Sequence, residues 1–145
     1  MIKILCVGKI KENYLQDLIN DYLKRISKYH KIEIIELKDD INYLKETNNL
    51  LEHIKMSDYN IALDIKGKSI TSEELASIID KTFLSNSTIT FIIGGSLGLS
   101  EEIKSKCQKV ISFSDLTFPH GLFRGILLEQ IYRSFKIINN ESYHK

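Results

Sequence analysis

The sequence has little of several features that mark special classes of protein. It has two cysteines, Cys6 and Cys107, without CxxC spacing, which favours buried, reduced thiols over a disulfide framework. It has no run of about 18 apolar residues, so no membrane-spanning helix is expected. Residues 1–14 contain only a short apolar stretch and no small-residue cleavage site, so a signal peptide is not expected. The expected location is the cytoplasm.

Clustered metal ligands and familiar catalytic groupings are also missing. The four histidines are His30, His53, His120 and His144, and none has a ligand-like spacing to another, so no metal site is expected. No Ser-His-Asp or Cys-His arrangement stands out. There is no repeat, low-complexity stretch or linker, and 145 residues suit one domain, residues 1–145.

The charge is nearly balanced overall, at +1, but it is unevenly distributed. Residues 1–31 carry a net charge of +4, residues 32–64 carry −5, residues 65–116 carry 0 and residues 117–145 carry +2. The basic segments at the two ends of the chain could form one face for an anionic ligand. The alternative is that they are ordinary solvated helix surface.

Short apolar runs alternate with helical patterns along the whole chain. Strands are predicted over residues 2–7, 32–37, 59–65, 88–93 and 110–113. Helices are predicted over residues 12–29, 41–55 and 119–138, with two more beginning at Thr71 and Ser100. The fully apolar run at 88–93 is typical of a parallel strand buried on both faces. This alternation predicts an α/β fold with a mostly parallel sheet and helices on both faces.

The glycine-rich segment 94–98 follows the most apolar predicted strand. Glycines there would let a ligand approach the backbone at the carboxyl edge of a parallel sheet. The spacing is GGxxG, which fits neither the dinucleotide fingerprint GxGxxG nor a phosphate-binding P-loop. The alternative is a plain turn between a strand and a helix.

Residues 63–68 follow the third predicted strand. Gly67 fits a turn, and Lys66 and Lys68 could face an anion. The alternative is a solvated turn.

The segment 113–120 joins the last strand to the last helix. Its apolar residues Phe113, Leu116 and Phe118 are costly to expose, so we expect this loop to be wrapped inward. His120 follows Pro119 at the start of the helix, and a neutral imidazole beside a ligand pocket could accept a proton. The alternative is that His120 is an ordinary polar residue in a turn.

The last helix is apolar around nearly its whole circumference. Such a helix must be buried all round, which favours a homodimer in which a second copy covers its outer side. The alternative is an unusually deep helix in a single chain. The tail at residues 142–145 carries a phenol, an imidazole and an ammonium, and is expected to add function but little stability.

These motifs together closely resemble the RlmH family of SPOUT-class methyltransferases, which act on large-subunit ribosomal RNA. The resemblance rests on residues 63–68, 93–99 and 113–120 in this order, with Tyr143, His144 and Lys145 at the end. It extends to residues 7–9 and 129–133, and so covers essentially the whole chain.

The resemblance implies a trefoil-knotted α/β fold, S-adenosyl-L-methionine as cofactor, and a homodimer. It implies methylation of N3 of a pseudouridine in 23S ribosomal RNA, on the assembled ribosome. Arg124, Tyr143 and His144 match positions tied to substrate handling. The positions that match cofactor contacts are Leu63, Gly94, Phe113, Ser114, Asp115, Leu116, Thr117 and Phe118.

Two points separate this chain from the family pattern. The region 41–58 is shorter than usual, and Gly125 replaces an aliphatic residue at a cost of up to about 1 kcal/mol in helix stability relative to alanine. The base that removes the imide proton stays open among His120, His144 and water. Two other functions also stay open: a non-catalytic RNA- or ribosome-binding module of the same fold, and a different small-molecule α/β enzyme.

Overall fold

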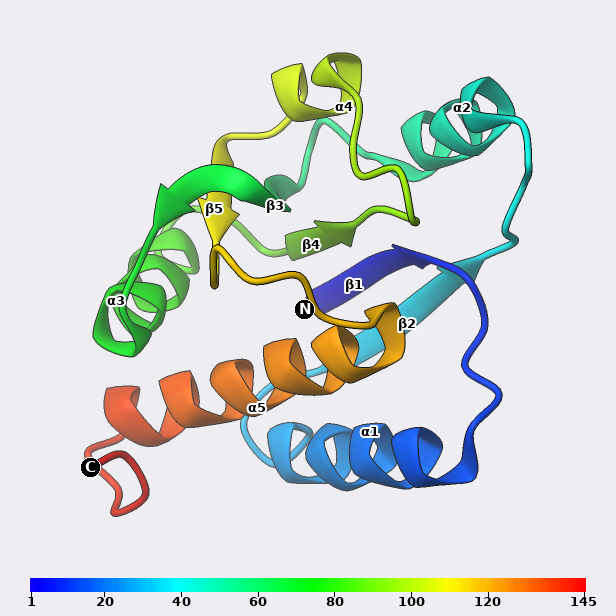
Figure 1. Cartoon of the computed structure of the whole chain (residues 1–145). Coiled ribbons are helices and arrows are strands. Elements are labelled where there is room, and N and C mark those ends of the chain that lie inside the picture. The colour runs from blue at the N-terminus through cyan, green and yellow to red at the C-terminus, as the bar shows by residue number, and fades with distance from the viewer.

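Five strands form one sheet in the order β2-β1-β4-β3-β5, and every neighbouring pair is parallel. The computed structural model in Figure 1 describes all 145 residues. The α/β class and the parallel sheet predicted from the sequence are confirmed. The strands are β1 (Ile2–Val7), β2 (Ile32–Leu37), β3 (Tyr59–Ser69), β4 (Ile89–Ile93) and β5 (Lys109–Ser112).

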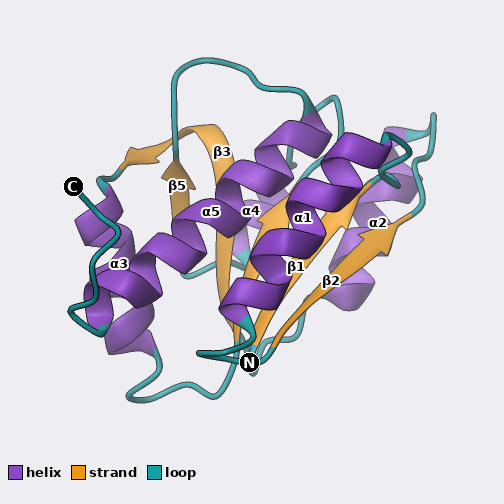
Figure 2. Ribbon diagram, turned by 90° about the horizontal axis from the view of Figure 1, so that it is seen from below, coloured by secondary structure: helices purple, strands orange, loops and turns teal.

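Helices cover both faces of the sheet, as the sequence predicts. One face packs against α1 (Asn13–Ile26), α3 (Ser72–Thr82) and α5 (His120–Ile138). The opposite face packs against α2 (Tyr43–His53) and the short α4 (Glu101–Ser105). In Figure 2, α5 lies between α1 and α3 across its face of the sheet. No helix is long and apolar enough to cross a membrane.

Alternation along the strands divides the core into two layers. In β1, Ile2 and Ile4 face the layer of α1, α3 and α5, whereas Leu5 and Val7 face the layer of α2 and α4. Both sets are buried, so the central strands are apolar on both sides. This explains why β1 and β4 are apolar on both faces apart from Lys3 and Thr90, which both bond to Asp58.

Side-chain caps place the starts of two of the helices. The Thr71 hydroxyl accepts a hydrogen bond from the Glu74 amide, and the Glu74 carboxylate accepts one from the Thr71 amide, so a capping box fixes the helix start predicted at Thr71. Asn42 caps α2 by accepting hydrogen bonds from the Leu44 and Lys45 amides. This cap explains why α2 begins at residue 43 and leaves Ile41 exposed.

The turn predicted at Gly67 is wrong. β3 continues to Ser69, and its pairing with β5 shifts register so that Leu63 and Lys68 both align with Ile111. A β-carbon on Gly67 would lie 2.7 Å from the Ile111 carbonyl carbon. Glycine is therefore needed for close approach of two strands at a bulge.

The chain itself covers most of α5. Leu127, Leu128 and Ile131 are fully buried, while polar groups such as Glu129 and Arg133 lie on its outer side. The apolar circumference is therefore largely explained by α1, α3 and the sheet, without a second copy. Gly125 lets α1 approach closely, because a β-carbon there would lie 2.6 Å from the Leu18 side chain.

Candidate functional site

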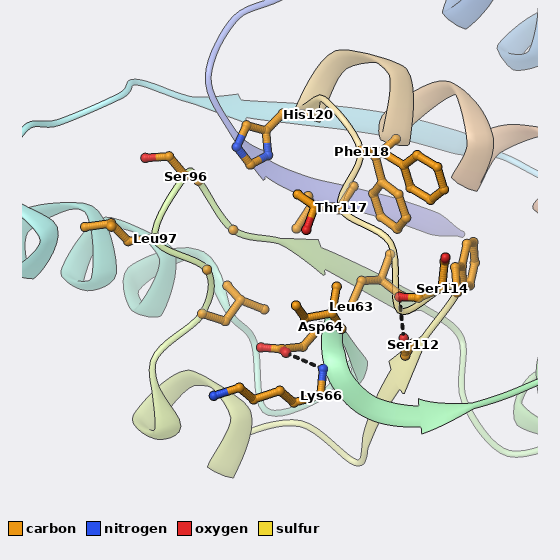
Figure 3. Close-up of a pocket in the computed structure, with 18 of the residues that line it drawn as sticks. Leu63, Asp64, Lys66, Ser96, Leu97, Ser112, Ser114, Thr117, Phe118 and His120 are labelled. Carbon is orange, nitrogen blue, oxygen red and sulfur yellow. Dashed lines mark hydrogen bonds between the residues drawn. The ribbon is translucent and has the colours of Figure 1, made fainter.

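A cavity of about 450 Å³ lies at the carboxyl ends of β4 and β5 and beside the middle of β3, where its pairing with β5 shifts register. Parallel strands bring their carboxyl ends to one edge, which is where open α/β sheets bind ligands. Figure 3 shows side chains from three chain segments and from the start of α5 around this space. The segments are residues 63–66, 93–99 and 112–118, and α4 and α5 contribute Glu101, Lys104, His120 and Phe123.

The glycine segment forms one wall of the cavity as a tight turn. The Gly98 amide donates to the Gly95 carbonyl at 3.0 Å, and Gly98 has a φ of +76°. A β-carbon on Gly94 would lie 2.8 Å from the Gly98 carbonyl group. A larger residue at 94 would therefore displace the turn itself.

The loop after β5 forms the opposite wall. The Ser112 hydroxyl donates to the Ser114 carbonyl at 3.0 Å, and the Leu116 amide donates to the Ser114 hydroxyl at 2.9 Å. Phe113 and Phe118 are half-buried, and both pack on Phe123 of α5. Leu116 is 69% exposed, so the prediction that this loop is wrapped inward fails at that residue.

An ion pair joins two walls of the cavity. Lys104 Nζ lies 2.8 Å from Asp64 Oδ2, and the Lys66 amide donates to Asp64 Oδ1 at 2.8 Å. Burial by itself raises the pKa of Asp64, but the hydrogen bonds from Lys104 and the Lys66 amide outweigh it and hold the pKa below its usual value. The carboxylate is therefore charged at neutral pH.

His120 stands at the rim of the cavity as the first residue of α5 (Figure 3). Its imidazole is exposed and makes no hydrogen bond within the chain. It is the only histidine that lines the cavity. Its ring nitrogens are therefore available to a ligand.

Arg124 lies one turn further along α5 but does not line the cavity. Its Nη1 is 2.7 Å from Glu36 Oε2, and its Nη2 donates to the carbonyls of Val7 and Gly8 at 3.2 and 3.0 Å. The side chain is 3% exposed, and its Nε has no partner. In the single chain, Arg124 therefore ties α5 to the ends of β1 and β2.

The tail folds back on α5 and is not a loose end. The Tyr143 hydroxyl donates to Glu129 Oε1 at 3.0 Å, and its ring lies edge-on to Tyr132 at a centroid distance of 4.9 Å. The Arg133 guanidinium lies 4.8 Å from the centre of the Tyr143 ring. Burial, followed by hydrogen bonding with Tyr22 and Glu129, raises the pKa of Tyr143. These contacts argue against the expectation that the tail adds little stability.

His144 is held between two charged side chains. Arg133 Nη1 lies 3.1 Å from His144 Nδ1, and His144 Nε2 lies 2.6 Å from Glu73 Oε1. A guanidinium can only donate, so this geometry makes Nδ1 the acceptor and leaves the hydrogen on Nε2. The hydrogen bond from His144 lowers the pKa of Glu73. Both imidazole nitrogens are thus engaged within the chain.

The first residue of α5, His120, lines the cavity, whereas the tail follows the last turn of the helix (Figure 1). The helix has 19 residues and is therefore about 28 Å long. Within one chain, the structure brings His120 to the cavity but leaves Arg124, Tyr143 and His144 away from it.

Most of the residues predicted to contact a cofactor do meet at the cavity. They are Leu63, Gly94, Phe113, Ser114, Leu116, Thr117 and Phe118, whereas Asp115 is not part of the lining. Sequence reasoning did not single out Lys104 or Phe123 as cavity residues. Asp64 directly follows Leu63 in a recognised motif, but a lysine at the end of a short helix gives no comparable signal.

Comparison with known proteins gives three findings. A family model described as "Predicted SPOUT methyltransferase" matches residues 1–144. Proteins named ribosomal RNA large subunit methyltransferase H, from Clostridium botulinum strains Kyoto and Loch Maree, are 52% and 50% identical over 157 residues, covering 99% of this chain and 99% of each relative. A solved structure from Haemophilus influenzae, titled a probable methylase family protein, aligns with a TM-score of 0.58. It is 13% identical, covers 99% of this chain and 70% of that chain, and supports the fold alone.

Proposed function

The chain belongs to the SPOUT methyltransferase family, and from this premise we propose that it methylates large-subunit ribosomal RNA with S-adenosylmethionine as donor. One observation carries the proposal. Three segments that lie far apart in the sequence, at Leu63, Gly94 and residues 113–118, converge on one cavity. We propose N3 of a pseudouridine as the acceptor atom, on the basis of the resemblance.

The cavity suits a cofactor of this kind. Its volume lies within the range of small-molecule sites. A β-carbon at Gly98 would enter open space, so the glycine exposes its backbone to a ligand on that wall. Leu63 and Phe118 would hold the apolar parts of the cofactor. When bound, S-adenosylmethionine supplies an electrophilic methyl group on its sulfonium.

The protein's own contribution is to position the acceptor and to remove its proton. The N3–H of a pseudouridine is an imide and must lose its proton before the nitrogen can attack. His120 is the histidine that lines the cavity and has no partner, whereas His144 Nδ1 already accepts a hydrogen bond from Arg133. We therefore assign the role of general base to His120.

We propose a homodimer in which the tail of one chain lies at the cavity of the other. Within one chain the tail is bonded to Glu129, Arg133 and Glu73 and does not line the cavity, so it could complete a site only on a second copy. Apolar side chains next to the cavity support this: Leu116 and Leu122 are 69% and 38% exposed. Sedimentation at micromolar concentration should give twice the 16.8 kDa chain mass, and a clean monomer would contradict the shared site.

The basic segments support an RNA substrate. α1 and α5 lie side by side (Figure 2), but Arg124 is buried and Arg133 and Lys136 are paired with carboxylates, so the exposed basic residues of this face come mainly from the end of α1. Lys24, Arg25 and Lys28 at the end of α1 are exposed and could contact phosphates. Following the resemblance, we expect the assembled ribosome to be the substrate, and equal methylation of naked RNA and ribosomes would count against this.

Cofactor binding tests the proposal directly. Calorimetry with S-adenosylhomocysteine should show one site per chain in the absence of RNA, because the cavity is formed within one chain. Absence of heat at millimolar ligand would overturn the proposal and favour a non-catalytic binding module. Mass spectrometry of ribosomal RNA from a deletion strain, with complementation, would then identify the methylated base.

A further inference from the structure

The Asp64–Lys104 ion pair lies inside the cavity but has no role in the reaction outlined above. The side chains are 12% and 15% exposed, and both residues line the cavity. Lys104 also lies 3.4 Å from Glu101, but that carboxylate is 92% exposed and is largely screened by solvent. The pair is the only ion pair that joins α4 to β3.

A contribution to fold stability does not by itself explain why two charged side chains occupy this position. Removing two ions from water costs about as much as their mutual attraction returns, and apolar side chains of similar size often serve a fold equally well. The distinctive property of the pair is its charge balance. The two other charged residues of the lining, Lys66 and Glu101, are exposed and opposite in sign, so with Lys104 in place the Asp64 carboxylate adds no net charge to the cavity.

Charge balance matters because the two ligands of a methyl transfer differ by one charge. The donor carries a positive sulfonium, whereas the product carries a neutral thioether in the same position. A cavity of this size keeps any bound group within about one Debye length, roughly 8 Å, of the pair. An unbalanced charge there would therefore discriminate between donor and product.

We propose that Asp64 and Lys104 set the relative affinity of the cavity for the sulfonium donor and the thioether product. The inference rests on the proposed function, because it takes the ligands to be S-adenosylmethionine and S-adenosylhomocysteine. Lys104 cancels the attraction of Asp64 for the sulfonium, and Asp64 cancels the repulsion by Lys104. The cavity then distinguishes donor from product by their shape and not by their net charge.

The test compares dissociation constants of the two ligands by calorimetry at low ionic strength. Lys104→Met leaves Asp64 unbalanced and should lower the ratio Kd(donor)/Kd(product) by on the order of threefold to tenfold. Asp64→Asn leaves Lys104 unbalanced and should raise the ratio by a similar factor. The double variant removes both charges and should return to within about twofold of the parent protein.

Matched controls come from α4 and the residue that follows it. Lys106→Met and Glu102→Gln make the same changes in formal charge at exposed positions that do not line the cavity, and both should leave the ratio unchanged. Raising the salt concentration should weaken the shifts in the two single variants. If the ion pair only stabilises the cavity wall, its loss would weaken the binding of both ligands equally and leave the ratio Kd(donor)/Kd(product) unchanged.

The outcomes separate the two proposals. If the parent protein binds neither ligand, the proposed function fails. If it binds both and the ratio is the same in all variants, the charge-balancing role is overturned. Should Lys104→Met be too unstable to purify, Asp64→Asn and the double variant decide the question, because a raised ratio in the first must vanish in the second.

Discussion

The two ends of α5 use their polar side chains in opposite ways. At the first turn, His120 is exposed and unpartnered beside a cavity walled by a glycine turn. Beyond the last turn, Tyr143 and His144 are bonded to Glu129, Arg133 and Glu73. The first end, which we call the open end, is accessible to a ligand. At the other end, which we call the assembled end, the tail side chains are already bonded within the chain.

This difference indicates how the two ends could cooperate. An open cavity with a free imidazole suits a cofactor and a reacting base. A rigid tail suits presentation to something outside the chain, because its side chains lose little further freedom on contact. Since α5 holds the two ends apart, the comparison favours a site built from two chains.

The largest effect should follow removal of the assembled end. Deleting residues 143–145 should lower methyl transfer to ribosomes at least about 1,000-fold, while S-adenosylhomocysteine affinity stays within about twofold. The melting temperature should fall by several degrees, because the packing of Tyr143 on Tyr132 is lost. A parallel loss of cofactor affinity would instead assign the tail to the cofactor pocket, and full activity would remove it from the site.

Damage to the open end should show the reverse pattern. Gly94→Val should weaken cofactor binding at least about 100-fold, because the turn must move away from a side chain at 94. Gly98→Ala is the matched comparison: it meets no atom, but its φ of +76° costs about 1 kcal/mol. Calorimetry and thermal melts separate the two, and normal binding by Gly94→Val would refute the cavity assignment.

Arg124 separates a structural role from a catalytic one. Arg124→Met should lower the free energy of unfolding by about 2–3 kcal/mol, less than for a fully buried pair, because Glu36 is 36% exposed. Urea denaturation measures this, with Glu36→Gln as the milder control because it keeps an acceptor. If stability is unchanged but turnover is lost, Arg124 would instead act directly on the nucleobase that is methylated.

The smallest effect should come from acid titration of the cavity pair. The pKa of Asp64 is lowered in the folded protein, so its stabilising contribution is present above its ordinary value of 3.8 and is lost as pH falls through the folded value. The stability difference between the parent protein and Asp64→Asn should therefore be constant near neutral pH and shrink below about pH 4. If the stability difference between the parent protein and Asp64→Asn instead became smaller as pH rose, the result would contradict a stabilising ion pair.

The sequence was informative where local pattern decides the structure. Apolar periodicity predicted all ten elements, and the motifs at Leu63, Gly94 and 113–118 predicted most of the cavity. The trefoil knot implied by the resemblance stays a prediction.

The failures come from contacts between distant residues. Gly67 lies against Ile111, Arg124 pairs with Glu36, and His144 meets Glu73. No periodicity encodes these pairings. Lys104 was missed for the same reason, since its partner Asp64 lies forty positions earlier, from 64 to 104.

Mixed dimers test the shared site most directly. Gly94→Val carries a damaged cavity with an intact tail, and the 143–145 deletion carries the opposite defect. If each site combines the cavity of one chain with the tail of the other, random mixing should restore about a quarter of the parent activity, because half of the dimers contain one intact site of two. Activity no higher than that of either variant alone would show that each chain works by itself, and would contradict the two-chain site.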